Sequence, residues 1–302
     1  MHSNPRAKVN LSLTVTGVRP DGFHELDSIF LRIGISDDLT VAFGDRGRDV
    51  LTVSGLPGCP VEGNLVLRAF AAVRRALGHD LPPLVAHLDK RIPIQAGLGG
   101  GSSDGAAALG AALQMWGAAL SPQRLDELAL ALGSDVPFFV RNLAAARVGG
   151  RGELLEPIRE AALDVGMLLV TPPIALPTAQ VYARFDELGG MRGTSADPGI
   201  VGRLPDAAQE LRDANDLWPA AVSLEPRLGD LRDELERWTS LPWLMSGSGS
   251  TLFAFYPSAE EAADAGQRLV ADADGLLGGS LINAVNLVGP DPVWRHQWPT
   301  EP

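Results

Sequence analysis

The sequence is poor in cysteine and lysine, and it contains no long apolar run. Cys59 is the only cysteine among 302 residues, so no intramolecular disulfide can form and a zinc site built on cysteines is implausible. No 18 consecutive apolar residues occur, which argues against a membrane-spanning helix. The first residues lack the apolar segment of a secretory signal peptide. We therefore expect a soluble, cytoplasmic protein.

Positive charge is also scarce. The chain has 25 Lys and Arg residues against 37 Asp and Glu, a net charge of −12. This balance argues against binding to nucleic acid or to an anionic membrane, but it allows one small basic pocket, and we expect a small-molecule partner. Lys8 and Lys90 are the only lysines in a chain that otherwise uses arginine. They are candidates for positions that require a compact ammonium instead of a planar guanidinium.

The hydrophobic pattern predicts a mixture of strands and helices. Polar and apolar residues alternate over 8–15, as in a half-buried strand. Asn64 can cap a helix over 65–77, and a continuous apolar run predicts a buried strand at 165–170. A boundary near 150–163 divides the chain into an α+β half and a second α/β half.

A glycine-rich segment gives the sharpest local signal. Residues 93–104 read Pro-Ile-Gln-Ala-Gly-Leu-Gly-Gly-Gly-Ser-Ser-Asp and lead into a helix expected from about Ser103 to Trp116. Glycines let backbone amides approach a ligand closely, and a helix N-terminus adds a positive dipole end and unpaired N–H groups. Ser102 and Ser103 add hydroxyls that can bond phosphate oxygens or Mg²⁺. The segment therefore indicates a polyphosphate site.

The common glycine-rich phosphate loops fit this segment poorly. A Walker A loop requires a lysine after the glycines, and none follows. A Rossmann fingerprint requires a third glycine at the position of Ser102, and the motif set of a protein kinase is absent. The plain alternative is a flexible hinge before a capped helix, although a hinge does not require Ser-Ser-Asp at the helix entrance.

Three separated motifs resemble the GHMP small-molecule kinases, in that family's order: Pro-Arg-Ala-Lys-Val-Asn-Leu at 5–11, Gly-Leu-Gly-Gly-Gly-Ser-Ser at 97–103 and Ser-Gly-Ser-Gly-Ser at 246–250. Further motifs are similar to the branch whose acceptor is a cytidine-diphosphate-linked methylerythritol. They are Arg-Pro-Asp-Gly-Phe-His-Glu-Leu at 19–26, Leu-Gly-Ser-Asp-Val-Pro-Phe-Phe at 132–139 and Asn-Asp-Leu at 215–217. The resemblance covers positions 5 to about 255.

The resemblance implies an α+β fold of two domains. An N-terminal, ribosomal-protein-S5-like domain over 1–155 would hold the glycine loop and ATP, and a C-terminal α/β sandwich domain over 156–290 would form the substrate side, before a tail at 291–302. The implied enzyme is a kinase that transfers the γ-phosphoryl of ATP to the 2-hydroxyl of the methylerythritol unit, in the non-mevalonate route to isoprenoid precursors. Either a monomer or a homodimer is compatible with the sequence.

The resemblance also implies the catalytic residues. Asp135 would accept the proton of the attacking hydroxyl, and Lys8 would be the catalytic lysine. An ammonium beside the carboxylate would keep it ionised and stabilise the forming alkoxide, by about 4 kcal/mol at ~4 Å and an effective dielectric constant of about 20. Asn10, on the same strand face as Lys8, would orient Lys8 or the hydroxyl. The plain alternatives are a helix cap for Asp135 and a solvated lysine at a strand start.

The implied cytidine site is an aromatic sandwich. Phe23 and Tyr182 match the family positions that stack on the base, although Phe23 stands where the family usually has Tyr. His24 would hydrogen-bond the polar edge of cytosine, and Thr178, at the start of the Tyr182 helix, would contact the diphosphate or another part of the substrate. A core aromatic beside a surface histidine is the plain alternative for Phe23 and His24.

For ATP, the resemblance implies positions on both sides of the glycine loop. Asn64 and Lys90 would line the adenine pocket with Leu65 as its apolar wall, whereas the plain alternative for Lys90 is a solvated charge at a strand end. The loop itself would contribute Pro93, Gly97, Leu98, Gly99, Gly100, Gly101, Ser102 and Ser103. Mg²⁺ is expected with ATP, held by phosphate, water and Ser102 or Ser103, because no carboxylate partner for the metal can be identified. Gln95 departs from the family's loop and could alter nucleotide affinity.

Two other functions stay open at this point. Another GHMP kinase, acting on mevalonate or homoserine, is disfavoured by the Phe-His pair at 23–24. A catalytically silent nucleotide-binding regulator on the same scaffold is disfavoured because both Lys8 and Asp135 are present.

Overall fold

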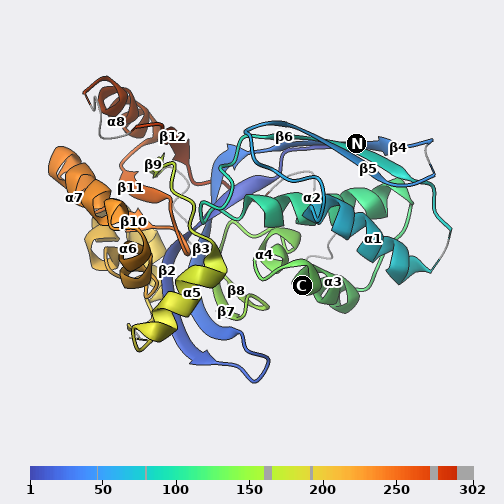
Figure 1. Cartoon of the computed structure of the whole chain (residues 1–302), viewed down its shortest axis with the longest axis horizontal. Helices are drawn as coiled ribbons and strands as arrows, with labels where there is room; N and C mark the ends of the chain where they lie inside the picture. The colour runs from blue at the N-terminus through green and yellow to red at the C-terminus, as the bar shows by residue number, and fades with distance from the viewer. Residues whose placement is uncertain (46, 79, 160–164, 191–192, 273–277, 291–302) are drawn as a thin grey trace.

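The molecule is elongated, with sheets and helices in three successive groups along its long axis (Figure 1). The computed structural model describes residues 1–45, 47–78, 80–159, 165–190, 193–272 and 278–290. Within this part of the chain the strands form three four-stranded sheets. The tail expected at 291–302 lies outside the described residues.

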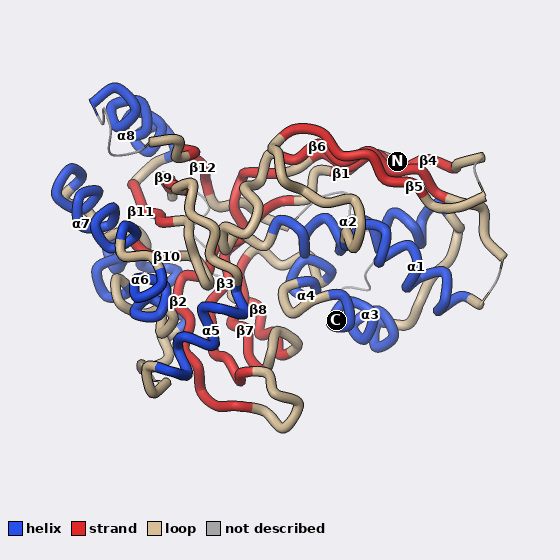
Figure 2. Tube along the Cα trace, viewed as in Figure 1, coloured by secondary structure: helices blue, strands red, loops and turns tan. Residues whose placement is uncertain are grey.

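The first group is a sheet covered on one face by helices (Figure 2). Its strand order is β1-β4-β6-β5, in which β5 runs parallel to β6 and the other neighbours are antiparallel. The strands are β1 (His2–Ser3), β4 (Asp38–Phe43), β5 (Val50–Gly55) and β6 (Leu84–Lys90). The helices are α1 (Leu65–Leu77), α2 (Gly100–Met115), α3 (Pro122–Leu132) and α4 (Val136–Val140).

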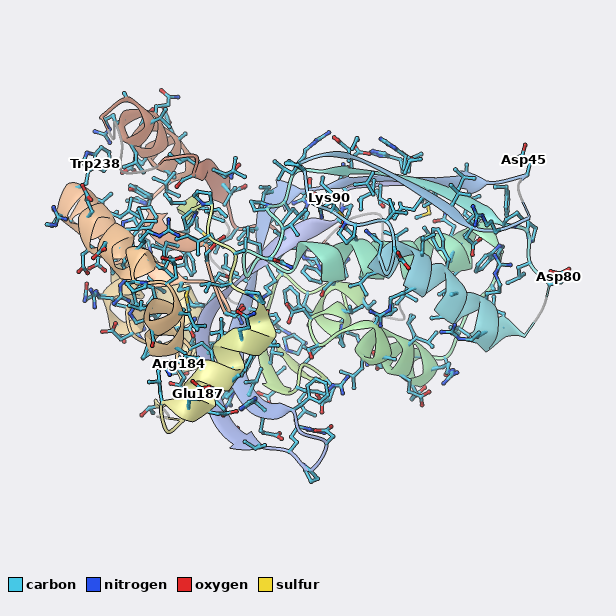
Figure 3. The ribbon with its side chains drawn as sticks, in the orientation of Figure 1. Asp45, Asp80, Lys90, Arg184, Glu187 and Trp238 are labelled. Atoms are coloured by element: carbon cyan, nitrogen blue, oxygen red, sulfur yellow. The ribbon has the colours of Figure 1, made fainter. Side chains whose placement is uncertain are left out.

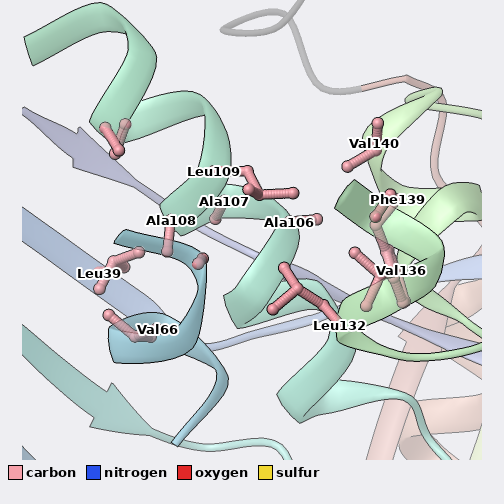
Figure 4. Close-up of a cluster of buried hydrophobic side chains, with 14 of the residues drawn as sticks. Leu39, Val66, Ala106, Ala107, Ala108, Leu109, Leu132, Val136, Phe139 and Val140 are labelled. Atoms are coloured by element: carbon pink, nitrogen blue, oxygen red, sulfur yellow. The ribbon is translucent and has the colours of Figure 1, made fainter. Parts of the chain in front are cut away.

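Helix α2 is the centre of this group because its side chains are small. Ala107, Ala108 and Leu109 are at most 3% exposed, and apolar side chains of α1 and α4 surround them (Figure 4). A helix that is apolar on all sides has to be enclosed by its neighbours. The packing on every side fixes the position of the α2 N-terminus, where the glycine loop ends.

The second group is a sheet of order β2-β3-β7-β8, built on two strands of 13 residues each. These strands are β2 (Arg6–Val18) and β3 (His24–Ser36), followed in the sheet by β7 (Ala145–Gly150) and β8 (Leu154–Pro157). The β2–β3 hairpin carries Lys8 near its buried end and Phe23 at its exposed turn.

The third group is a sheet of order β10-β11-β9-β12, in which β9, β10 and β11 are buried on both faces. Along β9 (Gly166–Thr171), Met167 and Leu169 face the β2–β3 hairpin, while Leu168 and Val170 face the helices, as the period of two in a strand requires. The other strands are β10 (Leu244–Met245), β11 (Leu252–Tyr256) and β12 (Leu281–Asn286). The helices are α5 (Thr178–Glu187), α6 (Trp218–Leu224), α7 (Arg227–Thr239) and α8 (Ala259–Asp272), with 3₁₀ turns η1 (Pro198–Arg203) and η2 (Asp206–Leu211).

One helix boundary and one whole helix differ from the sequence prediction. Helix α2 begins at Gly100 instead of Ser103, because Gly99 turns the chain with φ of 67° and Gly100 must lie against the Ile92 side chain. Helix α6 was not expected from the pattern. No helix among the described residues has both the length and the apolar character needed to cross a bilayer.

Candidate active site

Lys8 and Asp135, which are 127 positions apart in the chain, lie side by side. Lys8 Nζ is 3.2 Å from Asp135 Oδ2, and the two side chains are 4% and 28% exposed. Strand β2 brings Lys8 through the core, and Asp135 lies where the chain enters α4. The Asp135 side chain makes no capping hydrogen bond to α4, so its carboxylate is not used as a helix cap.

The Lys8 ammonium is held by several groups at once. It donates to Asn10 Oδ1 and, at 3.2 Å, to the Gly97 carbonyl, and it lies 4.5 Å from the centre of the Phe30 ring. Asn10 Nδ2 in turn donates to Ser28 Oγ at 3.0 Å. This network fixes the ammonium next to the glycine loop with one face toward Asp135.

The glycine loop presents backbone amides at the start of α2. Gly99 is the N-cap, so the N–H groups of residues 100–102 precede the first intrahelical bond, in which Ser103 N–H donates to the Gly99 carbonyl. Gly101 is exposed, and a β-carbon there would have no atom within 4 Å. The open space beside Gly101 is therefore available to a ligand.

Two serines of this loop have different surroundings. Ser102 is half-buried, and a β-carbon on Gly133 would lie 3.8 Å from Ser102 Oγ, which places the hydroxyl next to the segment that leads to Asp135. Ser103 is 3% exposed and its amide is already used. Ser102 is thus better placed than Ser103 to meet a phosphate.

The loop at 246–250 locks against the glycine loop. Ser246 Oγ donates to the Gly97 carbonyl at 2.8 Å and accepts from Asn10 N–H at 3.1 Å. A β-carbon on Gly97 would lie 2.0 Å from the Ser246 carbonyl oxygen, and the φ of Gly97 is +77°, so only glycine fits there. Asn215 Nδ2 anchors the 246–250 loop from its other side by donating to the carbonyls of Met245 and Gly247 at 2.9 and 2.8 Å.

On the substrate side, the structure pairs His24 with Tyr182. Their rings stack with centroids 4.7 Å apart, and His24 Nε2 is 2.9 Å from Asp186 Oδ1. Burial raises the pKa of Tyr182, and the negative charge of Asp135 raises it further, so the phenol stays neutral and lies within electrostatic reach of Asp135.

Phe23 lies at the exposed turn of the β2–β3 hairpin. The residue is 48% exposed, and its ring centroid lies 4.4 Å from the Arg151 guanidinium carbon. At the N-terminus of α5, Thr178 Oγ1 lies 3.0 Å from Ser248 Oγ.

The residues expected around adenine have mainly structural partners. Asn64 Oδ1 accepts from Val66 N–H as the N-cap of α1, and Leu65 packs 3.0 Å from the position of a β-carbon on Gly105. Pro93 and Leu98 are buried, and the Leu98 carbonyl accepts from Lys8 N–H. These positions shape the loop through backbone and packing.

The plain alternative for Lys90, a solvated charge at a strand end, is wrong. Its ammonium is 3% exposed and is enclosed between the carboxylates of Asp37 and Asp104. These two bonds use two of the three N–H donors of the ammonium. No sequence pattern pointed to Asp37 as a partner, since it lies 53 positions from Lys90.

Among the described residues, no group of three or more His, Cys, Asp and Glu side chains is placed to hold a metal ion. Mg²⁺ in proteins commonly takes several of its oxygen ligands from substrate phosphates and water.

The family comparisons agree with this geometry. Residues 64–142 match the GHMP kinases N terminal domain and residues 197–273 match the GHMP kinases C terminal domain. A protein of Pelotomaculum thermopropionicum named 4-diphosphocytidyl-2-C-methyl-D-erythritol kinase is 39% identical over 87% of this chain and 91% of its own length. A chloroplastic rice protein of the same name is 39% identical over 81% of this chain and 62% of its own length.

Solved structures give the same result for the fold. A crystal structure of 4-(cytidine 5'-diphospho)-2C-methyl-D-erythritol kinase is 32% identical with a TM-score of 0.74, covering 95% of this chain and 99% of the other. Mevalonate kinase of L. major is only 16% identical but has a TM-score of 0.67, over 96% of both chains. The expected α+β fold is confirmed. The chain belongs to the GHMP kinase family and, within it, to the 4-diphosphocytidyl-2-C-methyl-D-erythritol kinases.

Proposed function

We propose that this enzyme transfers the γ-phosphoryl group of ATP to the 2-hydroxyl of 4-diphosphocytidyl-2-C-methyl-D-erythritol, giving the 2-phosphate and ADP. The observation that carries the proposal is the Lys8–Asp135 pair, 3.2 Å apart, beside a loop of free backbone amides. Such a site offers a base, a fixed cation and phosphate donors within one region, which is what phosphoryl transfer requires.

In this proposal Asp135 accepts the proton as the substrate oxygen attacks phosphorus. Lys8, held by Asn10 and the Gly97 carbonyl, keeps its ammonium beside both the carboxylate and the loop, so it stabilises negative charge on the attacking oxygen. The amides of 100–102 and the Ser102 hydroxyl bind the phosphates, with Pro93, Gly97, Leu98, Gly99 and Ser103 shaping the loop. Asn64 and Leu65 border the adenine.

The cytidine half of the substrate is assigned to the β2–β3 hairpin and α5. Tyr182 provides a stacking surface, His24 provides a polar ring edge, and Phe23 closes the site from the hairpin turn. For a base to enter between these rings, His24 has to leave its stacked position on Tyr182. Thr178, beside Ser248, would contact the diphosphate.

Mg²⁺ is proposed as the counter-ion that accompanies ATP, bound by phosphate oxygens and water with Ser102 or Ser103 as the protein hydroxyl. We also propose that residues 1–155 form the nucleotide side, and that 156–290 form the substrate side together with the β2–β3 hairpin. No step of the reaction is assigned to the metal.

A coupled ADP-release assay tests the function. With ATP and Mg²⁺, the cytidine-diphosphate-linked methylerythritol should support turnover, whereas mevalonate and homoserine should not. Turnover with either of those two alcohols alone would favour another GHMP kinase. ATP binding without ADP release from any of the three would favour the silent nucleotide-binding regulator. Unchanged turnover in Lys8→Ala would contradict the role assigned to Lys8.

A further inference from the structure

The interior of the nucleotide side contains three ionisable side chains that the reaction does not use. Lys90 Nζ donates to Asp37 and, at 2.8 Å, to Asp104 Oδ2, and all three side chains are at most 3% exposed. We call Asp37, Lys90 and Asp104 the buried triad. Because desolvating such charges is costly and adds little net stability, the question is what the triad holds in place.

The three members come from three segments that meet at the start of α2. Asp37 lies between β3 and β4, and its Oδ1 accepts the backbone N–H groups of Arg91 and Ile92 at 2.6 and 2.8 Å. Lys90 ends β6, where Figure 3 labels it, and Asp104 lies one turn into α2. The triad therefore connects the segment that enters the glycine loop with the helix that leaves it.

The buried triad lies close to Gly100, the first residue of α2. A β-carbon on Gly100 would lie 2.8 Å from Ile92 Cγ2 and 3.4 Å from Lys90 Nζ. Asp104 Oδ2 accepts from Lys90 Nζ at 2.8 Å, and this bond connects the first turn of α2 to the end of β6. Movement of Lys90 or Asp104 would shift Gly100 and the amides that follow it.

We propose that Asp37, Lys90 and Asp104 are positioning residues, which set the glycine loop and the first turn of α2 for the triphosphate. The inference rests on the proposed binding of ATP phosphates to the amides of 100–102. Charge-assisted hydrogen bonds are short and directional, so they fix the two ends of the loop more tightly than apolar packing, which allows sliding. A displacement of about 1 Å in a site of this kind can cost about 100-fold in rate.

The test compares Asp104→Asn with a matched control, Asp49→Asn. Asp49 lies at the other end of β6, where its Oδ1 accepts from Leu84 N–H and Arg74 Nη2, both at 2.8 Å, and it is 16% exposed. It is a similar tether in the same sheet, remote from the loop. Both changes keep the side-chain shape and replace a carboxyl group by an amide, and the thermal midpoint of unfolding measures their general structural effect.

The readout is binding of a non-hydrolysable ATP analogue and of CDP, measured by calorimetry. For Asp104→Asn we expect affinity for the ATP analogue to fall about tenfold or more, with a parallel rise in the KM for ATP, whereas CDP affinity stays within about twofold. Asp49→Asn should leave both affinities unchanged, even if it lowers the thermal midpoint.

Equal ATP-analogue affinity in Asp104→Asn and Asp49→Asn would overturn the proposal. If Asp104→Asn does not fold, Asp37→Asn takes its place, because it leaves one ammonium facing one carboxylate and should give the same selective loss; retained affinity in that variant would again contradict the inference. Failure of the proposed function is distinguishable, since the unaltered enzyme would then bind CDP or the ATP analogue without phosphorylating the cytidine substrate.

Discussion

Replacement of Asp135 by asparagine removes the base while keeping the shape of the side chain. Two unit charges 3.2 Å apart attract by about 5 kcal/mol at an effective dielectric constant of about 20, and the 28% exposure of Asp135 reduces that value. Loss of a general base typically lowers the rate 10²–10⁴-fold. We expect kcat of Asp135→Asn to fall about 1,000-fold, with the affinity for an ATP analogue within about threefold of the parent.

A double-mutant cycle shows whether Lys8 and Asp135 act as one unit. Lys8→Met removes the ammonium but keeps a long unbranched side chain, and we expect a similar loss of kcat. Because each group depends on the other, the double variant should be about as slow as the slower single variant. The assay is single-turnover ADP formation with both substrates saturating.

The control for this cycle is Asp126→Asn. Asp126 also pairs with a basic residue of the same half, since Arg141 Nη2 lies 2.5 Å from its Oδ2, but the pair is remote from the glycine loop. Its kcat should stay within about twofold of the parent, as expected for an exposed ion pair. Near-parental kcat in Asp135→Asn, or losses that multiply in the double variant, would refute the coupled base and cation.

Three further outcomes are expected. Tyr182→Ala should weaken CDP binding far more than ATP-analogue binding in calorimetry, and equal weakening of both would remove Tyr182 from the cytidine site. Gly101→Ala should raise the KM for ATP without lowering the thermal midpoint, because its methyl group would occupy open space at the helix start; an unchanged KM would place the phosphates elsewhere. The hydrogen bond to Arg147 lowers the pKa of Asp27, so the ionised carboxylate stabilises the fold above pH of about 3.8 and this contribution is lost as the pH falls. Arg147→Met should therefore cost about 0.5–1 kcal/mol near pH 7 and nothing at low pH in chemical denaturation, and a cost that persists at low pH would contradict that origin.

Local capping made several elements predictable from the sequence. Asn64 caps α1 over Leu65–Leu77 as the sequence predicts, and Ser121 with Pro122 begins α3 by the same kind of local signal. The start of α2 was harder to predict, because glycine lowers helix propensity at every site, yet Gly100 belongs to the helix since Ile92 leaves no room for a side chain.

The role of Lys90 could not be read from its neighbours in sequence. Its two partners lie 53 and 14 positions away, and a lysine that ends an amphipathic strand is ordinarily solvated. The motifs that contain Lys8 and Asp135 match the family pattern, so the two residues could be named from the sequence. The 3.2 Å separation of their side chains depends on how β2 passes the start of α4. The orientation of Phe23 depends on a long hairpin whose turn contacts Arg151, which local pattern does not specify.

The sharing of strand β2 between both halves has a practical consequence for anyone dissecting this enzyme. Leu13 and Val15 of β2 pack with Leu168 and Leu217, and the 214–216 segment bonds to Leu13 through main-chain groups on either side of Asn215. A truncated product that stops near residue 155 would leave the apolar side chains of this strand uncovered, and Leu13 would lose its main-chain partners in the 214–216 segment. The nucleotide half is therefore unsuited to recombinant expression as a stand-alone ATP-binding module, and fragment studies should retain the full length.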